Sequence, residues 1–337
     1  MSKLALVRDK YLNLWDIGNY YGVVDKGVEL LLCGTNEVDW DSIMEYYPKA
    51  RFVNYTNLWE VLEHDPNVID VPDAFYPFSQ YFTDRFDKTV VVGWENLPGK
   101  NLFSQKALKC LKDAWKCTAR SSMAREELMF NGVPNEKINT IYGAIDIDFF
   151  KPGDSIERGN HVLFIGRVTQ EKGFLDLLWA LHNTGIKLKV AGVTEPPLQY
   201  QKWLSQLNVD IEFLGFLSRD ELVKQYQKAG CLCVPSLPLI NDTDPYGSWL
   251  EQFGQVFIEA MACGCPVVST RSGAIPEVVD SGGILVNPRD WPDLRKTIKQ
   301  IIKNGYGKTA SEMGRTVAEF CYDQNKIAKQ IVEWYEL

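Results

Sequence analysis

Short apolar runs alternate with segments of helical period through most of the second half of the chain. Hydrophobic runs predict buried strands at 161–165, 187–191, 211–214, 231–234 and 266–269. Between them, apolar residues recur every three or four positions, which predicts helices at 174–182, 198–207, 220–228 and 256–263. Ser218, followed by acidic residues, is a predicted helix N-cap. This repeated order favours parallel strands joined by right-handed crossovers.

The first half follows the same rhythm less regularly, with predicted strands at 4–7, 28–32, 68–71 and 89–92. Residues 146–154, which include Pro and Gly, are a predicted linker. The fold class is therefore α/β, with two doubly wound, Rossmann-like domains at 1–150 and 151–315 and a final segment at 316–337. Ligands of such sheets lie at the carboxyl ends of the strands, so we expect a site in the cleft between the domains.

Composition narrows the class of protein. The formal net charge of -8 over 337 residues disfavours a nucleic-acid-binding surface. The start of the chain lacks the pattern of a signal peptide, and no apolar run is long enough to span a bilayer. None of the eight cysteines forms a C-x-x-C pair, which disfavours both a zinc site and a disulfide framework. We expect a cytoplasmic protein.

The segment from Glu251 to Val268 carries the strongest chemical signal. Glu251 and Glu259 flank Gly254, and Gly254 lies where a helix is predicted to begin. A glycine lets the backbone approach a ligand, and the free amides of a helix start can hold a diphosphate. The carboxylate of Glu259 can accept hydrogen bonds from two neighbouring hydroxyls, as on a ribose. Taken alone, the two glutamates fit an ordinary amphipathic helix as well.

Two further loops fall at the same predicted sheet edge. Gly166, Arg167 and Lys172 follow a strand and precede a helix, so both cations are placed to neutralise a diphosphate. Residues 273–286 contain a second glycine-rich turn and the start of a helix. Individually, these motifs are also compatible with plain surface charges and an ordinary turn.

In this order and spacing, the three motifs resemble the family-four retaining glycosyltransferases, which have the GT-B fold. The resemblance covers the second domain, extends back to residues 132–152, and includes a last helix at 320–335 that returns to the first domain in this family. It implies transfer of a hexose from a nucleotide diphosphate sugar to a hydroxyl acceptor with retention at the anomeric carbon. The resemblance implies neither a bound metal nor a cofactor other than the donor substrate. A UDP-sugar is favoured as that donor over a GDP- or ADP-sugar.

The resemblance also implies roles for particular residues. Glu259 would bind the ribose, and the backbone near Gly215 would meet the base. The implied catalytic residues are Arg167, Lys172 and Glu251. The implied donor-binding residues are Gly166, Leu214, Gly215, Phe216, Phe253, Gly254, Gln255, Val256 and Glu259.

The first domain departs from the family pattern. The loop after the first strand contains Gly18 in place of a glycine pair, and the run 68–75 lacks the histidine that many members carry. Carboxylates or an amide near the expected cleft are candidate substitutes on the acceptor side, namely Asp70, Asp73, Glu95 and Asn96. The missing histidine keeps open a non-catalytic protein that binds a sugar nucleotide or a partner. A sugar phosphorylase or epimerase on the same fold is a further alternative.

Other features are ambiguous. Asp242 and Asp244, like Asp146 and Asp148, have the spacing of a D-x-D metal motif, but we interpret both pairs as loop carboxylates. A predicted helix at 104–116 has a basic face, formed by Lys106, Lys109, Lys112 and Lys116. Such a face suits peripheral contact with anionic lipid at the inner membrane surface, although an ordinary solvated helix face is favoured.

Overall fold

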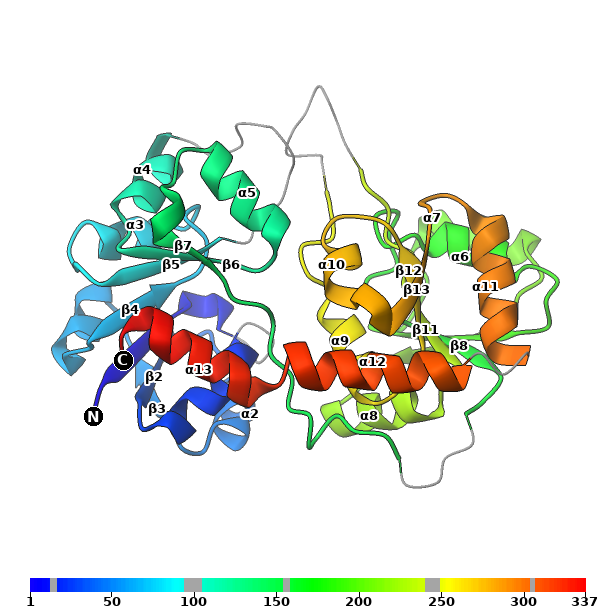
Figure 1. The fold of residues 1–337 in the computed structure, drawn as a ribbon, viewed down its shortest axis with the longest axis horizontal. Coiled ribbons are helices and arrows are strands. Elements are labelled where there is room, and N and C mark those ends of the chain that lie inside the picture. Colours follow the sequence, from blue (N-terminus) through cyan, green and yellow to red (C-terminus); the bar gives the residue numbers. More distant parts are fainter. Residues whose placement is uncertain (13–16, 94–104, 154–157, 240–248, 304–306) are drawn as a thin grey trace. The chain divides into compact units, whose positions relative to one another are not determined.

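The computed structural model describes residues 1–12, 17–93, 105–153, 158–239, 249–303 and 307–337, which form two compact units (Figure 1). Unit 1 consists of Met1–Ala144 and Asp323–Leu337, and unit 2 of Ile145–Tyr322. Unit 1 therefore ends before the expected boundary at 150, because residues just after Ala144 bond to unit 2. Ile145 N donates to Tyr322 O (2.8 Å), and the Arg315 guanidinium donates to Ile147 O (3.1 Å). The returning segment starts at Asp323 rather than at 316.

Unit 1 is built on a sheet of seven strands in the order β3-β2-β1-β4-β5-β6-β7, paired in parallel. The order reverses between β1 and β4, so the switch point of this sheet lies there. The strands are β1 (Lys3–Val7), β2 (Glu29–Gly34), β3 (Arg51–Asn54), β4 (Val68–Val71), β5 (Thr89–Gly93), β6 (Lys116–Ala119) and β7 (Ile138–Thr140).

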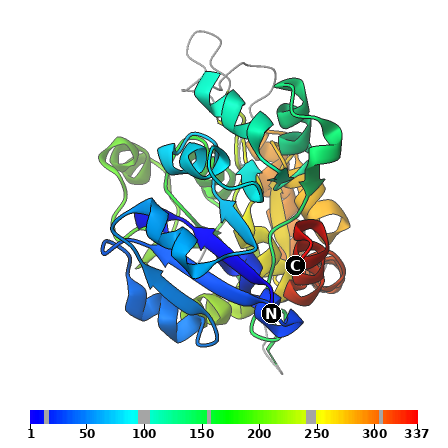
Figure 2. The same ribbon diagram turned by 90° about the vertical axis from the view of Figure 1, so that its left-hand side faces the viewer.

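Alternating side chains of these strands supply two hydrophobic cores, one on each face of the sheet. Ala5 and Val7 belong to one buried cluster, whereas Leu4 and Leu6 belong to the other. The blue and cyan helices and strands of unit 1 face the viewer in Figure 2. The helices of this unit are η1 (Asp9–Tyr11), η2 (Gly18–Lys26), α2 (Trp40–Tyr46), η3 (Leu58–His64), α3 (Pro77–Thr83), α4 (Gln105–Asp113), α5 (Ser122–Phe130), η4 (Asn135–Lys137) and α13 (Gln324–Tyr335).

Helix α13 is part of the second of these cores although it follows all of unit 2 in the sequence. Ile327, Ile331 and Tyr335 lie in the same buried cluster as Leu4 and Leu6. The helix approaches η2 so closely that a Cβ on Gly22 would stand 3.0 Å from the Cβ of Ala328. Glycine at this position therefore permits the contact between η2 and α13.

Unit 2 is built on a sheet of six strands in the order β10-β9-β8-β11-β12-β13, also paired in parallel. The order reverses between β8 and β11, which makes that edge the place where a ligand is expected. The strands are β8 (His161–Ile165), β9 (Lys187–Ala191), β10 (Ile211–Gly215), β11 (Cys231–Cys233), β12 (Val267–Thr270) and β13 (Gly283–Val286).

Helices lie on both faces of the unit 2 sheet (Figure 1). They are α6 (Phe174–Leu181), α7 (Leu198–Gln206), α8 (Arg219–Lys228), α9 (Gln255–Ala262), α10 (Ile275–Val279), η6 (Asp280–Gly282), α11 (Trp291–Lys303) and α12 (Gly307–Cys321). The predicted N-cap is confirmed, since Ser218 Oγ accepts a hydrogen bond from Glu221 N and the Glu221 carboxylate accepts one from Ser218 N. Every strand and helix predicted between 161 and 269 is present, with each end within one residue of the prediction.

Candidate functional site

Two loops meet at the switch point of unit 2. Strand β8 leads into residues 166–173 and β11 into residues 234–239, and Leu237 N donates to Glu171 O (2.8 Å) between them. Gly173 has a φ of +68°, and a Cβ there would overlap the carbonyl oxygen of Pro235. Glycine is therefore required for this loop to pack on the one after β11.

Three side chains come together here, of which Lys172 and Glu251 were predicted and Ser236 was not. Lys172 Nζ lies 2.7 Å from Glu251 Oε2, and Ser236 Oγ donates to the same oxygen at 3.0 Å. The side chain of Lys172 is 18% exposed and that of Glu251 is 8% exposed, so the ion pair is shielded from water. Sequence analysis missed Ser236, whose only signal was its place just after a buried strand.

The glycine-rich turn after β12 holds the backbone of Glu251. Ala274 N donates to Glu251 O at 2.8 Å. Gly273 has a φ of +56°, and a Cβ there would overlap that same carbonyl oxygen. The motif at 273–277 thus fixes Glu251 in place, a role that its sequence did not indicate.

Helix α9 begins directly behind this ion pair. Gly254 is its N-cap with a φ of +89°, a conformation that suits glycine, and Phe257 N donates to Gly254 O. The backbone amides of Gln255 and Val256 therefore lie in the first turn, where helices bind anions. Phe253 is 6% exposed and packs edge-on against Tyr322 with ring centroids 5.8 Å apart, so its side chain serves packing.

Glu259 lies in the second turn of α9 and is only 2% exposed. Tyr226, from α8, donates a hydrogen bond from its hydroxyl to Glu259 Oε2 (2.8 Å). Burial raises the pKa of Glu259 to about 7, against the opposing effects of the Tyr226 hydrogen bond and the charge of Arg219. A carboxyl group next to a helix start thus titrates near neutral pH. Tyr226 was not among the predicted site residues.

Three neighbouring strands end in glycines with positive φ at this edge. They are Gly166 (+136°) after β8, Gly192 (+101°) after β9 and Gly215 (+72°) at the end of β10. A Cβ on Gly166 would meet no atom within 4 Å, so its backbone is open to a ligand. Leu214 is half-buried and Phe216 is 82% exposed beside them. Gly192 was missed, although it follows its strand just as Gly166 does.

Arg167 is the most exposed of the predicted catalytic residues. Its side chain is 66% exposed and lies 3.2 Å from Glu171. Its guanidinium is therefore open to solvent, whereas the pair formed by Lys172 and Glu251 is shielded from water.

In unit 1, the acceptor-side candidates have different surroundings. Asp70 is completely buried, with Arg8 Nη2 2.7 Å from Oδ1 and the hydroxyls of Tyr20 and Tyr335 donating to Oδ2. These contacts favour a structural role for Asp70 over contact with a substrate. Asp73 is 7% exposed and accepts from Phe75 N (3.3 Å).

The other two acceptor-side candidates, Glu95 and Asn96, lie outside the described residues. Two buried arginines, Arg8 and Arg120, are 1% and 5% exposed and directly follow β1 and β6.

The predicted basic helix is shorter and more neutral than expected. Helix α4 ends at Asp113 because Trp115 N turns to pair with Thr89 O in the sheet. Lys109 forms ion pairs with Asp84 (2.8 Å) and Asp113 (2.6 Å). Lys116 instead belongs to β6 and bonds Glu336. Among the described helices, none is both long and apolar enough to cross a bilayer.

In the described ranges, no three His, Cys, Asp or Glu side chains are grouped so that they could hold a metal ion. Asp242 and Asp244 lie outside those ranges. Asp146 Oδ1 accepts from the backbone amides of Asp148 and Phe149, which is the hydrogen bonding of a turn.

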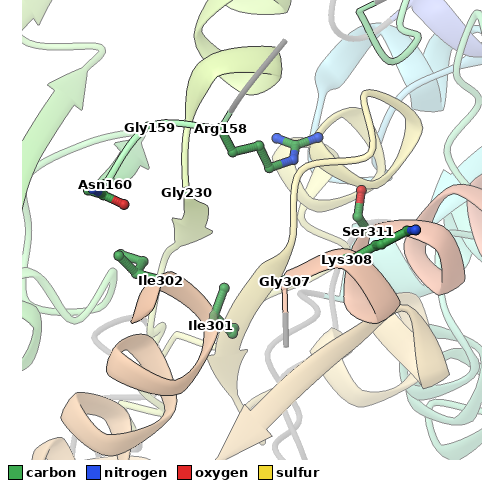
Figure 3. A pocket seen from close by; sticks show the side chains of 9 residues that line it. All are labelled: Arg158, Gly159, Asn160, Gly230, Ile301, Ile302, Gly307, Lys308 and Ser311. Carbon is green, nitrogen blue, oxygen red and sulfur yellow. The ribbon is translucent and has the colours of Figure 1, made fainter. Parts of the chain in front are cut away.

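A separate hollow of about 360 Å³ lies at the other edge of the unit 2 sheet (Figure 3). Asn160 and Gly230, which border it, directly precede β8 and β11, whereas Lys172 and Glu251 follow the carboxyl ends. The hollow is therefore not part of the predicted site.

Similarity to solved structures extends over the whole chain. Sucrose-phosphate synthase from Thermosynechococcus elongatus has a TM-score of 0.76 at 18% identity, covering 100% of this chain and 98% of that one. Anabaena Alr3699/HepE in complex with UDP-glucose has a TM-score of 0.73 at 21% identity, covering 99% and 98%. At these identities the likeness shows the fold, and it confirms the predicted GT-B class.

Relatives by sequence match the chain over part of their length. Uncharacterized glycosyltransferase MJ1607 of Methanocaldococcus jannaschii is 25% identical over 262 residues, covering 71% of this chain and 64% of that protein. D-inositol 3-phosphate glycosyltransferase of Mycobacterium sp. (strain JLS) is 28% identical over 214 residues, covering 57% and 46%. The chain thus spans less than two thirds of the length of these curated relatives.

The model of one protein family, glycosyl transferases group 1, matches residues 146–320, more than half of the 337 residues. The matched stretch contains every residue predicted to bind the donor, from Gly166 to Glu259. This chain belongs to the glycosyl transferases group 1 family.

Proposed function

We propose that this chain transfers a hexose from a nucleotide diphosphate sugar to a hydroxyl acceptor. The observation that carries the proposal is the ion pair between Lys172 and Glu251, set directly before the glycine-capped start of α9, which also carries the buried Glu259. A diphosphate needs a cation together with the backbone amides of a helix start. A ribose needs a buried hydrogen-bond acceptor, and the transferred sugar needs a second carboxylate. The family and the UDP-glucose complex of Alr3699/HepE support this assignment.

In the proposed reaction, Lys172, the exposed guanidinium of Arg167 and the amides at Gly254 hold the diphosphate. These groups stabilise the negative charge that grows on the leaving group as the glycosidic bond breaks. Glu259 accepts hydrogen bonds from the ribose hydroxyls, Glu251 contacts the sugar, and the open backbone at Gly166 leaves room for the nucleotide. The acceptor hydroxyl attacks the anomeric carbon from the leaving-group face, so the configuration is retained. Its oxygen forms the new glycosidic bond as the bond to the diphosphate breaks, and its proton passes to the departing diphosphate oxygen, so no step in this scheme needs a protein nucleophile.

Donor identity is tested by thermal shift with UDP-, GDP- and ADP-glucose, and UDP-glucose is expected to stabilise the protein most. In calorimetry, Glu259→Ala should weaken UDP binding at least tenfold, about the effect of losing a buried hydrogen-bonded carboxylate. Glu312→Ala, which removes an exposed glutamate of the same unit, is the matched control. Unchanged affinity of Glu259→Ala would remove Glu259 from the donor site.

Catalysis is tested by Lys172→Ala, which should lower kcat by about 100- to 1,000-fold. Rates near those of the parent chain would exclude the role of Lys172. Binding of UDP-glucose with neither transfer nor donor hydrolysis would instead indicate a non-catalytic sugar-nucleotide-binding protein. Release of a sugar phosphate that depends on added phosphate would indicate a phosphorylase. The acceptor and any contact with anionic lipid stay predictions.

A further inference from the structure

Trp249 is fixed two residues before Glu251 by a short antiparallel bridge. Leu239 N donates to Trp249 O (2.9 Å), and Trp249 N donates to Leu239 O (2.6 Å). Leu239 ends the loop 234–239, in which Leu237 N bonds Glu171 O. The bridge therefore anchors Trp249 to the loop that packs on the segment carrying Lys172. The backbone of Trp249 is therefore held by two hydrogen bonds to Leu239.

The indole faces the ammonium group of Lys172. Lys172 Nζ lies 4.9 Å from the centroid of the Trp249 ring and 2.7 Å from Glu251 Oε2. A cation at this distance from an indole face is attracted by the ring quadrupole, and the attraction grows when the pair is shielded from water. The ammonium is thus held by two groups of different character, one charged and one neutral.

These two contacts behave differently when a diphosphate arrives. The phosphate oxygens compete with the Glu251 carboxylate for the ammonium, because both are anions. The neutral ring does not compete with phosphate, so its contact with Lys172 can persist. Lysine has a long flexible stem, and without a second contact it would lose its orientation during this exchange.

We propose that Trp249 is a positioning residue that keeps Lys172 aimed at the diphosphate while the ammonium leaves Glu251. This inference rests on the proposed function. Trp249 touches no reacting atom in this scheme and acts through Lys172 alone. Its effect should therefore appear in kcat far more than in the affinity for UDP.

The first test measures the position of Lys172 without any activity. An amine-reactive reagent is applied and the labelling rate of Lys172 is read by mass spectrometry. Trp249→Leu should raise that rate severalfold, whereas Trp249→Phe, which keeps an aromatic face, should change it little. Trp203→Leu is the matched control, since Lys202 lies 5.8 Å from that half-buried ring in the same unit. An unchanged labelling rate in Trp249→Leu overturns the proposal, whether or not the protein proves to be a transferase.

The second test is a double-mutant cycle on donor turnover. Trp249→Leu should lower kcat about tenfold while UDP affinity stays within about twofold, and Trp249→Phe should recover most of the loss. In a Lys172→Ala background, Trp249→Leu should have no further effect. An equal loss in both backgrounds would show that Trp249 acts independently of Lys172 and would overturn the inference. Absence of turnover in the parent chain would count against the proposed function, and the labelling result would still decide the role of Trp249.

Discussion

Glu259 is a carboxyl group that the fold keeps almost completely out of water. Burial raises its pKa from the ordinary value of 4.5 to about 7. The protonated form is thus favoured in the folded protein, so this group's contribution to stability is present below pH 4.5 and is lost as the pH rises to about 7. Binding of ribose hydroxyls favours the ionised form, which accepts hydrogen bonds with both oxygens. Nucleotide affinity and fold stability should therefore respond to pH in opposite directions.

The first prediction concerns Tyr226, whose hydroxyl bonds Glu259 at 2.8 Å. This hydrogen bond lowers the pKa of Glu259, so Tyr226→Phe should raise it further. UDP affinity, measured by calorimetry from pH 6 to pH 9, should rise through about pH 7 in the parent chain. In the variant the midpoint should move upward by about one pH unit.

The matched control for this experiment is Tyr322→Phe. That substitution also removes a buried tyrosine hydroxyl, which donates to Val278 O at 2.9 Å, but it leaves Glu259 untouched. Coinciding pH midpoints for the parent and Tyr226→Phe would show that the hydrogen bond does not set the charge of Glu259.

At the scale of elements, arginines satisfy the free carbonyl groups at the ends of the unit 2 helices. Arg158 donates to Tyr226 O (3.0 Å) and Ala229 O (3.1 Å) at the end of α8, and to Cys263 O (3.2 Å) at the end of α9. Figure 3 shows its guanidinium beside the hollow, with Ser311 on the neighbouring α12. One planar group thus ties together the two helices that carry Tyr226 and Glu259.

A second prediction follows for Arg158→Ala. Loss of the Arg158 side chain leaves several carbonyls without donors. The free energy of unfolding of unit 2, measured with guanidinium chloride as denaturant, should therefore fall by about 2–4 kcal/mol. Arg158→Lys should lose less, because an ammonium replaces part of the donor set. Lys308→Ala, which removes an exposed cation bordering the same hollow, is the control and should unfold like the parent chain. Equal stability of Arg158→Ala and Lys308→Ala would contradict the proposed tie.

Elements with strong hydrophobic periodicity were predictable, and short or polar ones were not. Strands β8 and β9 coincide with their predictions because each is an apolar run bounded by turn residues. By contrast, β3 has charged or polar residues at both ends, and β7 has three residues, so neither stands out from a loop. Strand β13 falls in a segment that the sequence predicts as a glycine-rich loop. These strands are stabilised by pairing with neighbours, which local sequence does not reveal.

The candidate site divides in the same way. Motif spacing predicts Lys172, Glu251 and Glu259 as site residues, because each belongs to a local pattern. It did not indicate that Lys172 and Glu251 pair with each other, since the two lie on separate loops that only the fold brings together. Tyr226 and Ser236 were missed for the same reason. Asp70 is a candidate because it lies in the run 68–75 that lacks the family histidine, and this says nothing about the three side chains that surround it.

At the scale of the whole molecule, unit 1 is assembled from two separated stretches of sequence. Tyr335 of α13 donates to Asp70, the same carboxylate that bonds Arg8 and Tyr20. A buried carboxylate is costly unless donors surround it, so this network stabilises unit 1 only when α13 is in place.

The third prediction tests that network. Tyr335→Phe keeps the packing of the ring but removes one donor from Asp70, so unit 1 should lose about 1–3 kcal/mol. Hydrogen exchange of β4 amides provides the measurement, because β4 carries Asp70. Tyr21→Phe, on η2 but outside the network, should exchange like the parent chain. Equal exchange in Tyr335→Phe and the parent would show that α13 is held by apolar packing alone.

The place of α13 in the sequence imposes an order of events on protein synthesis. The ribosome must deliver all of unit 2 before it delivers α13, a delay on the order of ten seconds or more at ordinary elongation rates. During that interval the apolar surface of η2 lacks its partner helix, and Asp70 lacks the donor Tyr335 while it keeps Arg8 and Tyr20. The unit that is translated first therefore completes its folding second, and until then it is the part of the nascent chain with most need of a chaperone.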